Sequence, residues 1–188
     1  MRVILPALFI LTGCIADASA QSATIVAVPA ALSEALAEYR CMPVADDAQE
    51  LRHGRPWWIS LKSVTGGDAD FAFYCQISAD KPPLSKLVVV VRGENNPWRG
   101  CGAVVDSFRE RFTGWFPYDL AVASAESRHS SHTDLRHWWL VSSASNSKVT
   151  YGPAGVKVPN PIIDTIGQMG AGSLYACYSR QWYVIGLD

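Results

Sequence analysis

The sequence lacks most of the patterns that would identify a function class directly. It contains no CxxC pair and no HExxH motif, so the common zinc signatures are missing. It has no Asn-x-Ser/Thr acceptor site, and past its first residues it has no apolar run of about 20 residues, the length a transmembrane helix needs. The glycine-rich run around Ser173 lacks the second glycine of a nucleophile elbow. Function therefore has to be inferred from weaker features.

The chain also lacks an excess of charge of either sign. It carries 16 Lys and Arg residues against 17 Asp and Glu residues, which gives a formal net charge of −1. Binding to nucleic acid depends on cations that neutralise phosphates, and no basic block is present. We therefore expect that nucleic acid is not a partner. The hydrophobic fraction of 49% predicts a folded chain rather than a disordered one.

The first 20 residues have the features of an export signal. Arg2 precedes an apolar run over 3–16, and the small residues Ala18-Ser19-Ala20 follow it. Signal peptidase cuts after a small-x-small sequence of this kind. We expect residues 1–20 to be a signal peptide and residues 21–188 to be a single globular domain, periplasmic or secreted.

A second reading of the leader involves its cysteine. The sequence Leu11-Thr12-Gly13-Cys14 fits a bacterial lipobox, in which the cysteine is acylated and becomes the new N-terminus. Cleavage at that point would tether the protein to the outer membrane through Cys14. The well-formed site at Ala20 favours release of a soluble domain, and the lipoprotein is the alternative.

Cysteine is scarce, and its number is informative. Setting Cys14 aside leaves Cys41, Cys75, Cys101 and Cys177. An even number of cysteines in an oxidising compartment predicts two disulfides. Four cysteines allow about three pairings, of which we favour Cys41–Cys75 with Cys101–Cys177. The spacing favours no metal ligand set, and we expect no cofactor.

The apolar pattern predicts secondary structure along the whole mature chain. Helical spacing predicts helices over 29–40, 103–112 and 160–170. Alternating or continuous apolar residues predict strands over 57–64, 71–77, 87–91, 118–123, 135–142, 174–178 and 181–187, with 149–151 as a further short segment. Polar segments predict loops over 43–56 and 124–134.

These elements predict an α+β fold. A mostly antiparallel sheet of about seven strands would carry about three helices, because several strands are joined by short turns. A small β-barrel with peripheral helices is the alternative architecture.

Two pairs of adjacent tryptophans are the main candidates for binding. Consecutive strand residues point to opposite faces, so each pair would place one indole outward. An outward indole next to a cation could form an aromatic surface for a protein or a glycan. The candidate binding residues are Trp57, Trp58, Trp138, Trp139, Arg136 and His137. The conservative interpretation is that layers cover both faces of the sheet and that the tryptophans belong to the core.

The segment 129–137 is the main candidate for catalysis. His129, His132, Asp134 and His137 have the chemistry of metal ligands, but their spacing matches no known metal signature. No catalytic residue can be named. We therefore expect a non-catalytic binding or inhibitory module of the bacterial envelope. A small secreted hydrolase that uses a histidine of this segment is the alternative.

Overall fold

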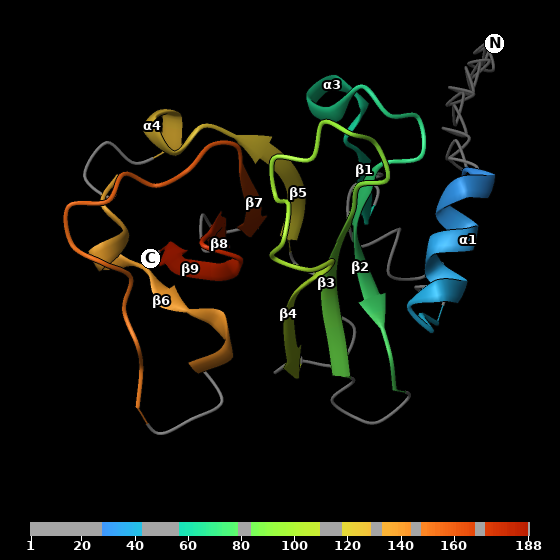
Figure 1. Cartoon of the computed structure of the whole chain (residues 1–188). Coiled ribbons are helices and arrows are strands. Elements are labelled where there is room, and N and C mark those ends of the chain that lie inside the picture. The colour runs from blue at the N-terminus through green and yellow to red at the C-terminus, as the bar shows by residue number, and fades with distance from the viewer. Residues whose placement is uncertain are drawn as a thin grey trace, which may run out of the picture.

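The computed structural model describes residues 28–42, 57–78, 84–109, 118–128, 133–143, 148–167 and 172–187. Over these ranges the chain forms two antiparallel sheets and three helices, and the predicted mostly antiparallel α+β fold is confirmed (Figure 1). The strands form two separate sheets rather than one closed barrel. None of the described helices is both long enough and apolar enough to cross a membrane.

The first sheet, sheet A, has four strands in the order β1-β2-β3-β4, and the second, sheet B, has five in the order β5-β7-β8-β9-β6. The strands of sheet A are β1 (Trp58–Ser60), β2 (Phe71–Gln76), β3 (Leu84–Val90) and β4 (Val104–Arg109). The strands of sheet B are β5 (Tyr118–Ala123), β6 (Trp139–Leu140), β7 (Ile162–Gly167), β8 (Gly172–Tyr178) and β9 (Gln181–Leu187). The helices are α1 (Ala30–Glu38), α3 (Lys62–Thr65) and α4 (Ala125–Arg128), with the 3-10 turns η2 (Leu135–His137) and η3 (Val141–Ser143).

Sheet A is buried on both faces. Every residue from Phe71 to Cys75 in β2 is buried, and so are the residues 87–90 of β3. A strand covered on both sides has this continuous apolar character. One cover is α1, which lies on the side of sheet A away from sheet B and buries Leu32 and Ala35 (Figure 1).

Sheet B separates two hydrophobic clusters. Neighbouring residues of β7 point to opposite faces, as the two-residue period of a strand requires. Ile163 belongs to the large cluster that fills the space between the sheets, together with Tyr175 and Trp182. Ile162 belongs to a second cluster around Trp138 on the other face of sheet B. Ala125 of α4 and Leu135 of η2 belong to this second cluster, so these two elements cover the outer face.

The two sheets meet along both of their edges. β1 lies against β5 at one edge, and β4 lies against η3 at the other. The disulfide Cys101–Cys177 joins the segment before β4 to β8, and the disulfide Cys41–Cys75 joins the segment after α1 to β2. The structure thus contains the pairing that the sequence analysis favoured. One bridge holds the helix on sheet A, and the other links the two sheets.

Two of the three predicted helices were wrong. The segment 103–112 contains β4, which pairs antiparallel with β3, and the segment 160–170 contains β7, which pairs with β5 and β8. The β-branched pairs Val104-Val105 and Ile162-Ile163 open these segments, and such residues favour extended backbone. Asn160 does not cap a helix of its own: its Oδ1 accepts a hydrogen bond from the N–H of Ala125 in α4, at 2.8 Å.

The predicted strand over 135–142 was largely wrong as well. Only β6, of two residues, is extended, between η2 and η3. Asp134 explains the first turn, because its Oδ1 accepts the N–H of Arg136 at 2.9 Å and caps η2. The pairing with 149–151 is present as a bridge between Trp139 and Tyr151.

Five of the remaining predictions match described elements, and the others differ or lie outside the described residues. The helix over 29–40 and the strands over 71–77, 118–123, 174–178 and 181–187 match described elements within a few residues. The predicted strand over 57–64 is shorter, because β1 ends at Ser60 and α3 follows. The loop over 43–56 lies outside the described residues, and the predicted loop over 124–134 contains α4.

Candidate functional site

The four candidate tryptophans are mostly enclosed. Trp57 and Trp138 are 3% and 0% exposed, and both belong to the hydrophobic clusters. Trp58 and Trp139 are half-buried, and Trp58 packs edge-on against Phe71 with ring centroids 5.8 Å apart. Each pair has one fully enclosed indole, although Trp57 and Trp138 lie just before β1 and β6 and not within these strands. The second indole of each pair is only partly accessible.

The two tryptophan pairs do not form one surface. Trp58 lies on β1, the edge of sheet A that adjoins β5, whereas Trp139 lies on β6, at the opposite edge of sheet B. Arg136 and His137 are exposed in η2, and Arg136 Nε lies 3.3 Å from Asp134 Oδ2. A binding role for these residues stays a prediction, but the structure does not gather them at a single site.

The structure brings no metal or catalytic group together in the described part of the segment 129–137. His129 and His132 lie outside the described residues, and His137 is exposed. Within the described ranges, no group of three or more His, Cys, Asp or Glu side chains is placed to hold a metal ion. Of the three histidines in this segment, the structure therefore describes only His137. His137 does not line the groove that is described in the next paragraph.

A groove of about 710 Å³ opens where β4 meets sheet B. We call it the edge groove. Its walls come from β4, from the β6–η3 segment and from the turn between β8 and β9. It is lined by Cys101, Val104, Val105, Asp106, Ser107, Leu140, Val141, Ser142, Arg180, Gln181 and Trp182. The lining mixes apolar side chains with a few polar groups, as ligand sites typically do.

Asp106 forms a polar bridge across the two sheets beside this groove. Its Oδ2 accepts the hydroxyl of Tyr175 on β8 at 3.0 Å, and its Oδ1 accepts the N–H of Ser107 at 2.7 Å. Burial raises the pKa of Asp106, while the hydrogen bonds from Tyr175 and Ser107 partly oppose this rise. Burial, with the nearby charge of Asp106, holds the pKa of Tyr175 well above its usual value. The groove therefore contains a half-buried carboxyl group.

This burial predicts a pH dependence of stability. Because the pKa of Asp106 is raised on folding, the folded protein holds this proton more tightly than the unfolded chain. The contribution of protonated Asp106 to the free energy of unfolding is fully present below the pKa that this group has in the unfolded chain. It is lost as the pH rises through the pKa that the group has in the folded protein. We expect the stability of Asp106→Asn relative to wild type to rise across this window. The gain is about 1.4 kcal/mol per pH unit between the two pKa values.

Urea denaturation of both proteins at a series of pH values measures this difference. The asparagine side chain keeps an oxygen acceptor but does not titrate, so it is the matched comparison for the protonated acid. A stability difference that stays constant with pH would show that burial does not perturb Asp106.

Asp106 could not be recognised from the sequence, because it lies in the segment 103–112, whose apolar spacing predicts a helix. The available local signal was the β-branched pair Val104-Val105, which favours a strand. Nothing local indicates that Tyr175, 69 positions away, supplies the hydroxyl. The association depends on how the two sheets pack.

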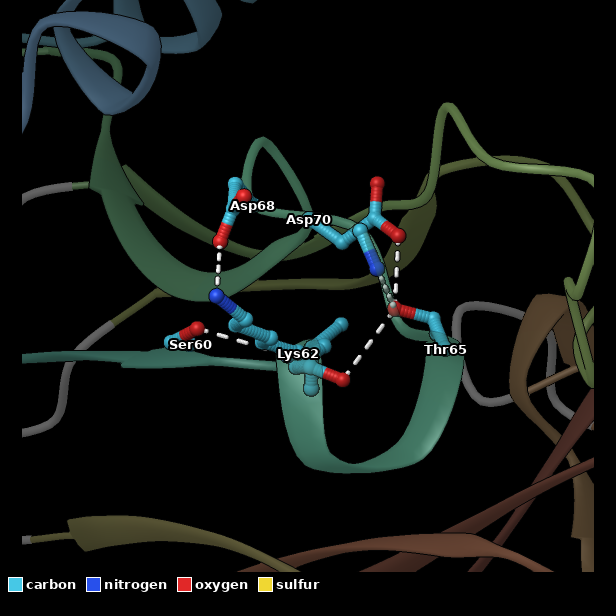
Figure 2. Close-up of polar contacts among 7 residues, drawn as sticks. Ser60, Lys62, Thr65, Asp68 and Asp70 are labelled. Carbon is cyan, nitrogen blue, oxygen red and sulfur yellow. Dashed lines mark hydrogen bonds and ion pairs between the residues drawn. The ribbon is translucent and has the colours of Figure 1, made fainter.

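The carboxyl group of Asp70, just before β2, is fully buried and serves structure. Asp70 is 1% exposed, and its oxygens accept the hydroxyl of Thr65 at 2.6 Å and the N–H of Arg92 at 2.7 Å. Figure 2 shows Asp70 pointing to Thr65, while the neighbouring Asp68 points to Lys62. These contacts fix the turn after α3 to the end of β3.

The edge groove has three properties of a recognition site. It is open, it contains a half-buried carboxyl group, and it lies where β4, the last strand of sheet A, adjoins η3. No protein-family model matches the chain, and no curated protein or solved structure is significantly similar to it.

Proposed function

We propose that this protein is an exported binding module of the bacterial envelope and that its ligand occupies the edge groove. The observation that carries the proposal is the groove itself, at about 710 Å³. Ligand sites typically measure about 300–1,000 Å³ and combine apolar walls with a few placed polar groups. Val104, Val105 and Trp182 supply apolar wall, and Asp106 supplies the polar group.

A binding role fits the groove better than hydrolysis does. Asp106 is held by two donors, Tyr175 and Ser107, which fix its position for recognition. Acid–base hydrolysis usually needs a second titratable group tuned to work with the first. Tyr175 does not suit this role near neutral pH, because its pKa is held well above 10.0.

The disulfides support the proposed location. Two disulfides are present, and such bonds persist in oxidising compartments such as the periplasm or the cell exterior. We place the mature protein there, released by cleavage after Ala20, with attachment through Cys14 as the alternative.

Two exposed valines allow a matched test of the groove. Val104 is 38% exposed and lines the groove, while Val149 is 47% exposed and lies outside it. We expect Val104→Arg to weaken ligand binding at least tenfold, because a long charged side chain would fill the groove, and Val149→Arg to leave binding unchanged. The probes are an array of short peptides and a panel of oligosaccharides. Affinities are measured by fluorescence anisotropy on the mature oxidised protein.

The two variants make the result decisive. Binding that is lost in Val104→Arg and kept in Val149→Arg supports the proposal. The proposal is wrong if no probe of either class binds the wild type, or if both variants bind as the wild type does. Thermal unfolding of each variant shows whether it is folded before its affinity is measured.

The leader makes a separate prediction. We expect the exported chain to begin at Gln21, because the small residues Ala18-Ser19-Ala20 precede it. The intact mass of the protein recovered from the periplasm measures this directly. A mass that retains Cys14 with attached acyl chains, and that changes in Cys14→Ala, would identify the lipoprotein instead.

A further inference from the structure

The edge groove is lined by an exposed arginine, Arg180. Within the described ranges, no carboxylate forms an ion pair with its guanidinium group. Asp106, the half-buried carboxyl group of the same groove, accepts its hydrogen bonds from Tyr175 and Ser107 instead. A guanidinium group without an acidic neighbour is available to an anionic group of a ligand.

The turn that carries Arg180 holds this residue in an unfavourable backbone conformation. Tyr178 pairs with Gln181, so Ser179 and Arg180 alone connect β8 to β9. Both have positive φ, 49° and 65°, as a two-residue hairpin turn of type I′ requires. Such turns favour Asn-Gly, because glycine adopts positive φ without a steric cost. An arginine in the place of this glycine indicates that its side chain, and not its backbone, accounts for its presence.

The neighbouring turn makes room for the Arg180 side chain. Gly100 adopts φ +90°, and a Cβ there would lie 2.9 Å from Arg180 Cγ and 3.5 Å from its Cδ. Because this Cβ is absent, the arginine stem can lie beside the segment that leads to Cys101. The disulfide Cys101–Cys177 holds this segment to β8, close to the turn. The stem is therefore placed at the Cys101 end of the edge groove.

The groove has to recognise its ligand through side chains. η3 lies against β4, and the N–H of Ser107 is already donated to Asp106. The exposed serines Ser107 and Ser142 line the groove together with Asp106. A ligand hydroxyl group both donates and accepts hydrogen bonds, so it can pair with serine and with a carboxyl group in either protonation state. A sugar suits such a lining better than a peptide strand, which depends on free main-chain groups.

Asp106 and Arg180 act at different places along β8. Tyr175, which donates to Asp106, lies three positions before Tyr178, the last residue ahead of the turn. At about 3.3 Å per residue, these two positions are roughly 10 Å apart. An anionic group beside Arg180 is thereby kept away from the carboxyl group of Asp106, which would repel it. A ligand of two sugar rings can reach both residues.

We propose that the edge groove binds an acidic saccharide, whose carboxylate or phosphate group pairs with Arg180 and whose hydroxyl groups bond to Asp106. This inference rests on the proposed function and specifies its ligand class. A guanidinium group donates two parallel hydrogen bonds to either kind of anion. The shared requirement is therefore an anionic group on a hydroxyl-rich ligand.

The test compares four labelled probes, by fluorescence anisotropy, on the full mature, oxidised protein. Three probes are the same glucose disaccharide, either neutral, with a terminal carboxylate or with a terminal phosphate. The fourth is a capped peptide that carries one glutamate. We expect an acidic disaccharide to bind about tenfold or more tightly than the neutral one, the effect of one hydrogen bond between charged groups. The tighter of the two acidic forms identifies the anion.

Two glycine substitutions in the same turn separate recognition from folding. Arg180→Gly removes the cation and relieves a positive-φ strain, so the urea midpoint of unfolding should equal or exceed that of the wild type. The preference for the acidic disaccharide should fall to about unity. Ser179→Gly relieves the same kind of strain but keeps Arg180, and it should keep the preference. A lower midpoint with an unchanged preference in Arg180→Gly would show that Arg180 is structural and would overturn the inference.

The failures of the two proposals are distinguishable. Equal binding of the neutral and acidic disaccharides, lost in Val104→Arg, would overturn the role of Arg180 and keep the proposed function. Binding of the glutamate peptide in preference to every disaccharide would overturn the saccharide class. No binding by any of the four probes would overturn the inference. No binding by the wider peptide and oligosaccharide panels would overturn the proposed function as well.

Discussion

Removing the disulfide Cys101–Cys177 is expected to lower the free energy of unfolding by about 4.5 kcal/mol, the loop-entropy value for a long closed loop. The two cysteines are 76 positions apart, so their bond greatly restricts the unfolded chain. In the folded protein the bond joins the segment before β4 to sheet B beside the edge groove. The double variant Cys101→Ser/Cys177→Ser, unfolded in urea under oxidising conditions, measures the loss.

The second disulfide provides an internal comparison. Cys41 and Cys75 are 34 positions apart, for which the same relation gives about 3.8 kcal/mol. Cys41→Ser/Cys75→Ser should therefore destabilise the protein slightly less. It should leave the amide shifts of Val104–Ser107 unchanged, since this bond lies on the α1 side of sheet A. A loss below about 1 kcal/mol for the Cys101–Cys177 pair would show that the closed loop is not what stabilises the joined sheets.

Replacing Asp70 by alanine is expected to cost about 3 kcal/mol or more. Its carboxylate accepts hydrogen bonds from Thr65 and from the N–H of Arg92 in a fully buried position. Each hydrogen bond to a charged group contributes about 1.5–3 kcal/mol, and the donors left behind lose their partner. Thermal and urea unfolding measure the loss.

Asp68 is the matched control for Asp70, because it lies in the same turn and differs in exposure. Its carboxylate is 82% exposed and pairs with Lys62, and ion pairs of this kind contribute little. Asp68→Ala should therefore unfold as the wild type does, within error. Equal losses of stability in Asp70→Ala and Asp68→Ala would mean that removing either aspartate destabilises the turn, and that the buried hydrogen bonds of Asp70 are not the cause.

The sequence predicts the secondary structure correctly where the local apolar pattern agrees with the tertiary packing. The strands β2, β8 and β9 were predictable because their apolar residues alternate or run continuously between clear turns. The disulfide pairing could be favoured but not fixed, since spacing alone leaves about three possibilities. The fold class followed from these strands even though two helices were assigned wrongly.

The strands β4 and β7 show why the rest could not be predicted. In both segments the apolar residues also match the three-to-four-residue spacing of a helix, so periodicity alone does not decide. What decides is pairing with distant strands: Val104 aligns with Val88, and Ile163 with Tyr175. Long-range pairing of this kind overrides a local helical pattern.

The candidate site depends even more on distant contacts. The tryptophans were the visible signal, and the sequence could not reveal that α1 and the α4–η2 segment cover the sheets that carry them. The edge groove brings together β4, the β6–η3 segment and the β8–β9 turn, which are far apart along the chain. Asp106 meets Tyr175 only through this assembly, which the local sequence pattern does not reveal.

The absence of a side chain at position 100 has a consequence for the packing around one of the disulfides. Gly100 adopts φ +90°, and a Cβ there would lie 2.9 Å from Arg180 Cγ. The missing side chain lets the turn that ends in Cys101 settle against the turn that follows Cys177. A bulkier residue there would require the Arg180 side chain or the turn that carries it to shift. The packing around the Cys101–Cys177 bond thus depends on a residue that takes no part in it.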